Sequence, residues 1–135
     1  MDKMDKQSLV KIFNDKLYEF VSDLLLIYPE DIDLYTFKSS LNVIWLIDDK
    51  KTIKIFNRYV VEKYRTELSS RNEQFFIDYS FDNEIQQYTK NETDFSIQLM
   101  NKLKSYWSDM KNENKTIVFK YFDVLIAICD KYIIA

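Results

Sequence analysis

The chain contains no glycine and no histidine, and it has a single cysteine, Cys129. Without glycine, the Gly-rich phosphate-binding loops of the Walker and dinucleotide types are excluded. Without histidine, the commonest general base and the commonest transition-metal ligand are both missing. A cysteine nucleophile normally needs an adjacent imidazole, and Cys129 has none. We therefore predict that the protein is not an enzyme and that it has no metal or organic cofactor.

The lack of glycine and of a second cysteine also bears on the turns and on the cellular compartment. Turns that need a positive φ must use Asn or Asp, because no glycine is available. Cys129 cannot form an intramolecular disulfide, which is typical of a reducing compartment. Residues 1–6 alternate in charge and lack the apolar region of a secretory signal, and Lys120 and Asp123 interrupt the longest apolar run. We expect no membrane span, no secretion and an intracellular or virion location.

The residues that are abundant indicate one globular domain. Of the 135 residues, 47% are hydrophobic, 30% are charged and 16% are aromatic. A chain of this length can bury about two-thirds of the surface exposed by its unfolded state. The high aromatic content predicts a core that is built largely from rings.

The stretch Lys115–Ile134 predicts the central helix of the fold. Its polar residues collect into one narrow strip at 100° per residue, while apolar residues cover well over half of the circumference. A helix of this kind must be covered on several sides. The apolar set is Ile117, Val118, Phe119, Tyr121, Phe122, Leu125, Ile126, Ile128, Cys129, Tyr132 and Ile133.

The remaining segments also favour helices, since none shows sustained period-two alternation. Helices are predicted from Gln7 to about Tyr28, from about residue 32 to Ile47, over residues 50–68, from a Ser70–Glu73 capping box, and from residue 93 or 94 to about Met110. Residues 1–6 are predicted to be frayed and residues 80–93 to form a long connection. The fold class expected is all-α: a single-domain bundle, residues 1–135, of five or six helices around a largely buried C-terminal helix.

The second predicted helix has more apolar residues than one core face requires. Its expected core face consists of Leu34, Phe37, Leu41, Ile44 and Trp45. Val43, Leu46 and Ile47 lie elsewhere on the circumference, so we expect another element or a partner to cover them. The excess is compatible with a homodimer, although it does not require one.

Several short clusters form one pattern along the chain. They are Phe13-Asn14-Asp15-Lys16-Leu17 with Glu19-Phe20 and Asp23-Leu24, Tyr28-Pro29-Glu30-Asp31 ahead of Phe37, Arg71-Asn72-Glu73-Gln74-Phe75-Phe76, Leu103 with Tyr106-Trp107, and Glu113-Asn114-Lys115 with Lys120-Tyr121-Phe122 and Val124-Leu125. Together they resemble small uncharacterised all-α proteins encoded by large nucleocytoplasmic DNA viruses of algae and other protists. The resemblance spans most of the chain, and it implies a viral accessory or virion-associated protein, such as a minor capsid component, with no catalytic residues to transfer.

A basic stripe is the first candidate binding surface. Residues 50–71 contain seven basic and two acidic side chains, a net charge of +5, although the whole chain carries −3. At the helical step of about 100° per residue, Lys51, Lys54, Arg58 and Arg65 fall within about 60° of one another. The stripe is either a solvated face balanced by acidic segments or a docking surface for phosphate or an acidic protein. A pI near 5.0 disfavours nucleic acid as the ligand.

The aromatic connection is the second candidate surface, and it comprises Phe75, Phe76, Tyr79 and Phe81. Its rings either pack as a lid across one end of the bundle or serve as interface anchors, provided that they are exposed. Trp107 is expected at the edge of an apolar face, with its ring nitrogen at a polar rim.

The functional prediction is a non-catalytic structural or protein-interaction protein, virion-associated, that binds acidic surfaces of other proteins, capsid or viral ones among them. The alternative is a nucleic-acid-associated regulatory factor or adaptor that acts through the basic stripe.

Overall fold

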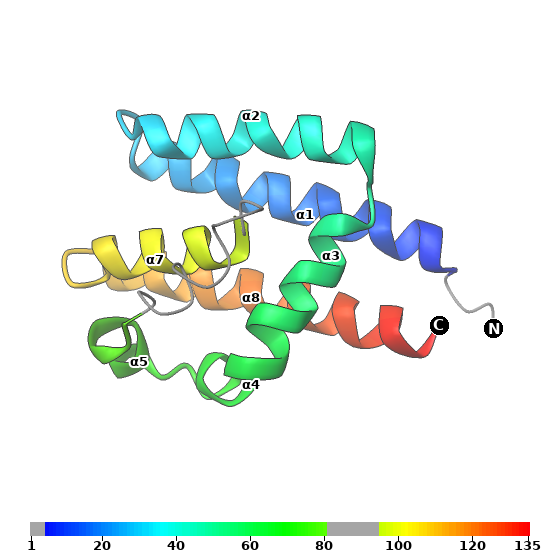
Figure 1. The fold of residues 1–135 in the computed structure, drawn as a ribbon. Coiled ribbons are helices and arrows are strands. Elements are labelled where there is room, and N and C mark those ends of the chain that lie inside the picture. The colour runs from blue at the N-terminus through cyan, green and yellow to red at the C-terminus, as the bar shows by residue number, and fades with distance from the viewer. Residues whose placement is uncertain (1–4, 81–94) are drawn as a thin grey trace. The chain divides into compact units, whose positions relative to one another are not determined.

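The computed structural model describes residues 5–80 and 95–135, and every regular element there is a helix (Figure 1). The all-α prediction is therefore confirmed. The predicted connection 80–93 lies, beyond Ser80, outside the described residues. The elements are α1 (Lys6–Ile27), α2 (Ile32–Ile47), α3 (Lys51–Phe56), the π-helix η1 (Asn57–Val61), α4 (Glu62–Ser69), α5 (Glu73–Asp78), α7 (Phe95–Trp107) and α8 (Asn112–Ile134). None of the helices in these described ranges is both long and apolar enough to cross a membrane.

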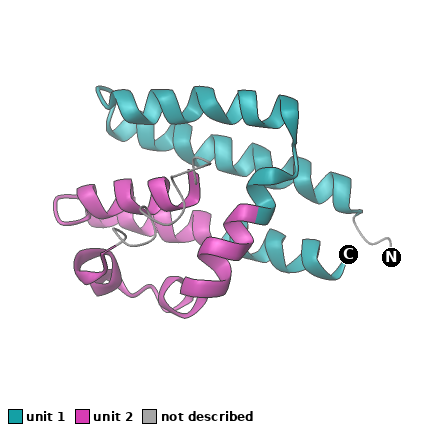
Figure 2. Ribbon diagram, viewed as in Figure 1, with its two compact units in different colours: residues 1–54, 124–135 teal, residues 55–123 magenta. Residues whose placement is uncertain are grey.

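The helices group into two compact units, and the single domain expected from the sequence stays a prediction (Figure 2). Unit 1 comprises residues 1–54 and 124–135, and unit 2 comprises residues 55–123. No linker separates them, because α3 and α8 each begin in one unit and end in the other. This continuity explains why no shift in composition marks the boundary in the sequence.

In unit 1, α1 and α2 form an antiparallel hairpin that turns at Pro29 (Figure 1). The Asp31 side chain caps α2 by accepting a hydrogen bond of 3.1 Å from the Leu34 backbone N–H. Near the start of α1, Lys6 Nζ lies 5.0 Å from the centre of the Tyr132 ring of α8. Of the residues whose helical spacing predicts one inward face on α1, namely Leu9, Phe13, Leu17, Phe20, Leu24 and Ile27, all are buried except Ile27, which is half-buried. Val10, Val21 and Leu25 are buried beside them.

A buried chain of hydrogen bonds joins α1, α2 and α3 within unit 1. The Thr52 hydroxyl donates to Asn14 Oδ1 at 2.6 Å and accepts from Trp45 Nε1 at 3.0 Å. Asn14 Nδ2 in turn donates to the Asp49 carbonyl at 2.9 Å. Both Asn14 and Thr52 are buried, so these bonds satisfy polar groups that water cannot reach.

Unit 2 has an aromatic core, as the composition predicted. Phe76 stacks on Trp107 with ring centres 4.3 Å apart, and Phe119 contacts both rings edge-on at 6.0 and 5.4 Å. Phe122 extends this cluster toward Phe56, at 6.3 Å. The inward residues predicted for the 50–68 helix are all buried: Ile53, Phe56, Val60, Val61, Tyr64 and Leu68.

The turn before α5 differs from the prediction in two ways. Asn72, not Ser70, is the N-cap residue, and its side chain accepts from the Phe75 backbone N–H. Arg71 has a positive φ of 55°, although Asn and Asp were the residue types expected at turns with a positive φ. The Arg71 guanidinium donates to Asp123 Oδ2 at 2.8 Å and lies 5.6 Å from the Phe119 ring centre, and these contacts offset the cost of a left-handed backbone.

The apolar side of the C-terminal helix α8 is largely buried, as predicted. Its buried residues include Val118, Phe119, Phe122, Leu125, Ile126, Ile128 and Cys129. Ile117 and Ile133, which the apolar pattern also placed in the core, are 41% and 54% exposed. The pattern counts apolar residues around the helix, but it does not show on which sides other helices lie.

Candidate functional site

The four residues of the predicted basic stripe are divided between the two units. Lys51 and Lys54 belong to unit 1, whereas Arg58 and Arg65 belong to unit 2. The uniform 100° step used to align them does not hold, because residues 57–61 form a π-helix and Tyr64 has non-helical backbone angles. Lys54, Arg58 and Arg65 are exposed, while Lys51 is half-buried. Their role in binding stays a prediction.

The aromatic connection belongs mainly to the core of unit 2. Phe75 and Phe76 are buried, so they do not meet the condition of exposure on which their role as interface anchors depended. Tyr79 is half-buried and packs 5.2 Å from Phe75 and 5.4 Å from Tyr64. Phe81 lies outside the described residues. The alternative interpretation, that these rings pack against their own chain, fits Phe75 and Phe76.

Trp107 is enclosed completely, which corrects the prediction that its nitrogen reaches a polar rim. Its side chain has no exposed surface, and Nε1 is buried without a hydrogen-bond partner. The Phe76 ring stacks on it, and Lys115 Nζ lies 5.6 Å from its ring centre. Packing against rings thus outweighs the loss of one hydrogen bond at this position.

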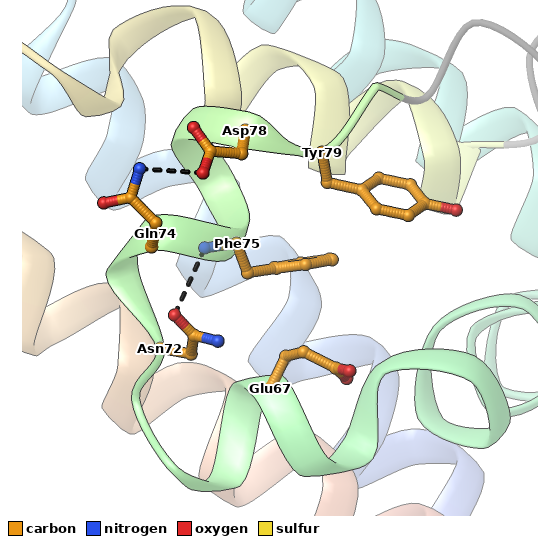
Figure 3. Close-up of a pocket in the computed structure, with 6 residues that line it drawn as sticks. All are labelled: Glu67, Asn72, Gln74, Phe75, Asp78 and Tyr79. Carbon is orange, nitrogen blue, oxygen red and sulfur yellow. Dashed lines mark hydrogen bonds between the residues drawn. The ribbon is translucent and has the colours of Figure 1, made fainter.

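A pocket of about 360 Å³ lies in unit 2, beside α5 (Figure 3). Its polar groups already stabilise the helix, since Gln74 Nε2 donates to Asp78 Oδ2 and Asn72 caps α5. The Phe75 ring packs on Tyr64 at 5.1 Å. Glu67 Oε2 is buried without a hydrogen-bond partner, but Glu67 as a whole is only half-buried. The lining is explained by the local fold and does not define a ligand.

The most unusual surface of unit 1 is the outer face of α2. Its exposed apolar side chains, each 50–88% accessible to solvent, are Ile32, Tyr35, Val43, Leu46 and Ile47. Only Leu34 and Leu41 of this helix are buried. We call the five exposed side chains and Ser39, which lies among them on the helix, the α2 face.

The α2 face carries no charge. Within Ile32–Ile47 the charged residues are Asp33 and Lys38, and neither belongs to the face. Lys38 Nζ lies 4.9 Å from the centre of the Tyr18 ring on α1, so it points toward the hairpin partner. An exposed helix normally has charged residues opposite its buried side, and α2 has apolar ones there.

The sequence had marked only part of this face. Val43, Leu46 and Ile47 were expected to need a cover, but Ile32 and Tyr35 were not noticed, and Phe37, Ile44 and Trp45 were placed in the core although they are half-buried. The low number of charges in residues 32–47 was the available indication. Because α2 buries only the narrow side that carries Leu34 and Leu41, most of this apolar helix remains accessible.

Titration and metal binding give little further guidance. The pKa of Asp5 is lowered, mainly by the hydrogen bond from the Ser8 backbone N–H and then by the Ser8 hydroxyl, because Asp5 caps α1. Among the residues that the structure describes, no group of three or more His, Cys, Asp or Glu side chains could hold a metal ion.

Comparison of the chain with family models, with curated proteins and with solved structures gives no match. The resemblance to giant-virus proteins therefore stays a prediction.

Proposed function

We propose that this chain is a non-catalytic interaction protein that binds another protein molecule through the α2 face. The observation that supports the proposal most directly is the accessibility of five large apolar side chains on one uncharged helix face. Covering one such side chain removes on the order of 100 Å² from water, so the face offers on the order of 500 Å². Patches of this size on a monomer are often functional.

The proposal that the chain is not an enzyme rests on its composition. Histidine and glycine are absent, so acid–base chemistry would depend on carboxylates or lysines, and nucleotide loops built on glycine are excluded. The pocket beside α5 is lined by groups that already stabilise this helix. Binding of another protein requires neither catalytic residues nor a nucleotide-binding loop nor a cavity.

Site-specific photo-cross-linking in the cells that produce the protein tests the proposal. A benzophenone amino acid at Val43, on the α2 face, is expected to give a covalent adduct of defined mass. The matched control places the same group at Lys11, whose side chain is 76% exposed on α1 and does not belong to the α2 face. Equal adducts at both positions, or none at Val43, would contradict binding through this face.

We further propose that the protein is a component of virus particles, as the family resemblance implies. Quantitative mass spectrometry of purified particles of the source virus is expected to find a fixed number of copies relative to the major coat protein. Abundance in infected cells together with absence from particles would refute this part of the proposal and leave binding through α2 untouched.

A nucleic-acid-associated role is the second candidate, and the exposure of Lys54, Arg58 and Arg65 favours it. It predicts binding to duplex or single-stranded nucleic acid that weakens steeply with salt and that charge reversal of Lys54 and Arg58 reduces. Charge reversal of Lys11 and Lys111, which are exposed elsewhere, is the control. No binding at modest salt would eliminate this candidate.

A further inference from the structure

Five of the six members of the α2 face, all except Ile47, are spaced symmetrically along the helix. Ile32, Tyr35, Ser39, Val43 and Leu46 follow one another at intervals of three, four, four and three residues. At about 100° per residue these five positions fall within an arc of about 80°. The pattern reads the same in both directions from Ser39, so a twofold axis through Ser39 exchanges Ile32 with Leu46 and Tyr35 with Val43.

We propose that the α2 face binds a second copy of this chain, with the two α2 helices antiparallel and crossing at Ser39. The inference rests on the proposed function, since it names the partner of the same face. In this arrangement Ile32 lies opposite Leu46 of the second copy, and Tyr35 lies opposite Val43 of the second copy. An isologous contact of this kind requires a self-complementary surface, which the symmetric spacing provides.

The residue at the centre of the pattern allows the helices to approach. Helices pack with their axes 8–10 Å apart, and the distance depends on the side chains at the point of contact. Ser39 is small, exposed and flanked by apolar residues at both four-residue intervals. A large side chain at this position would hold the two helices apart, whereas serine lets the flanking side chains meet.

Charge favours the antiparallel direction over the parallel one. Residues 30–33, at the N-terminal end of α2, include three carboxylates, whereas residues 45–48, at its C-terminal end, include one, that of Asp48. A parallel pair would place three carboxylates beside three others. With the axis at Ser39, an antiparallel pair places residues 30–33 beside residues 45–48 of the second copy, which carry one carboxylate, and it also aligns the helix dipoles favourably.

The available area predicts a weak and reversible dimer. The four apolar side chains of the symmetric set on each copy bury on the order of 800 Å² in total, which is below the roughly 1,600 Å² of a standard interface. We therefore expect monomer and dimer to exchange and the dimer fraction to rise with concentration over the micromolar range. Sedimentation velocity over a series from about 1 to 500 μM measures this rise.

Leu46→Glu tests the contact itself. Leu46 is 88% exposed, so the change leaves the fold intact but places a charge on the α2 face. We expect its dimer Kd to rise at least tenfold. Ile134→Glu is the matched control, because Ile134 is 80% exposed near the end of α8 and outside the face, and its Kd is expected to stay unchanged. Equal effects of the two changes would overturn the proposal.

Disulfide mapping tests the direction and the centre of the pair. Ser39→Cys is expected to cross-link with itself under mild oxidation, because the axis brings the two copies of this residue together. Tyr35→Cys and Val43→Cys are each expected to stay monomeric alone but to cross-link when mixed. Their eight-residue offset is about 12 Å along a helix, and disulfides require Cα atoms within about 7 Å.

Controls and outcomes are separate for each variant. The wild-type chain controls for Cys129, which is buried, and Ser69→Cys controls for collisions, because Ser69 is exposed on α4. If Tyr35→Cys cross-links with itself as efficiently as it does with Val43→Cys, the pair is parallel and the proposal is refuted. If Ser69→Cys cross-links at the same rate as Ser39→Cys, the links arise from random collisions, and the proposal is also refuted.

The result also separates this inference from the proposed function. A chain that sediments as a monomer up to about 500 μM and yields no linked species refutes the second copy as partner. If the benzophenone amino acid at position 43 then still gives an adduct whose mass is not twice that of the chain, the α2 face binds a different protein, and the proposed function stands. If no adduct forms either, both proposals fail.

Discussion

The Thr52 hydroxyl links three helical segments of unit 1, and its removal tests how much this link contributes to stability. In Thr52→Val the shape of the side chain is kept, but Asn14 Oδ1 loses its donor and Trp45 Nε1 loses its acceptor. A buried polar group that loses its partner costs about 1–3 kcal/mol. Trp45 is half-buried, so water can replace part of its bond.

These terms combine to an expected loss of about 2 kcal/mol in the free energy of unfolding, since the additional buried methyl group returns at most about 0.8 kcal/mol. Urea denaturation followed by circular dichroism measures the loss. Thr66→Val on α4 is the control, because Thr66 is exposed and its replacement should change stability by less than about 0.5 kcal/mol.

A double-mutant cycle makes the prediction stricter. Because Asn14 and Thr52 share one bond, the loss in the double variant Asn14→Ala, Thr52→Val should be smaller than the sum of the two single losses by about 1 kcal/mol. A Thr52→Val variant as stable as the wild type, or losses that are additive, would refute the assignment of this chain of bonds as a stabilising element.

Two further predictions concern packing and pH. Leu41→Ala should lower the free energy of unfolding by about 2–5 kcal/mol and Leu46→Ala by less than about 0.5 kcal/mol, because the first side chain has no exposed surface and the second is 88% exposed; thermal melts of both variants check this. Asp5 contributes stability above its unfolded pKa of 3.8 and loses it as the pH falls through its lower folded pKa. Asp5→Ala should therefore be less stable than the wild type at pH 7, and the difference in stability should shrink at about pH 3. Asp5→Asn is the control, because asparagine retains a cap that does not titrate. Urea denaturation at both pH values measures these differences.

The sequence predicted well where a helix has one clear apolar side. The buried residues of α1, and those of the 50–68 segment from Ile53 to Leu68, follow the expected periodicity. The π-helix at Asn57–Val61 was not expected, since nothing in the residue types marks a wider turn. Its presence leaves the buried residues inside but breaks the alignment of the basic stripe.

Prediction was weaker where the number of neighbouring elements decides the outcome. On α2 the sequence shows apolar residues on nearly all sides, and only the structure shows that burial is confined to Leu34 and Leu41. Phe75 and Phe76 show the opposite case, because aromatic residues beside an irregular segment were compatible with both a lid and an exposed anchor. Exposure depends on tertiary packing, which local patterns do not contain.

The arrangement of the units has a consequence for synthesis on the ribosome. Unit 1 needs residues 124–135, and the 69 residues 55–123, which separate its two parts in the sequence, are translated first. At about 5–20 residues per second this takes on the order of 4–14 s. Unit 2 is thus complete before unit 1, which reverses the usual N-terminal-first order. The α1–α2 hairpin emerges earliest, and it must keep its apolar sides from aggregating until the last turns of α8 arrive.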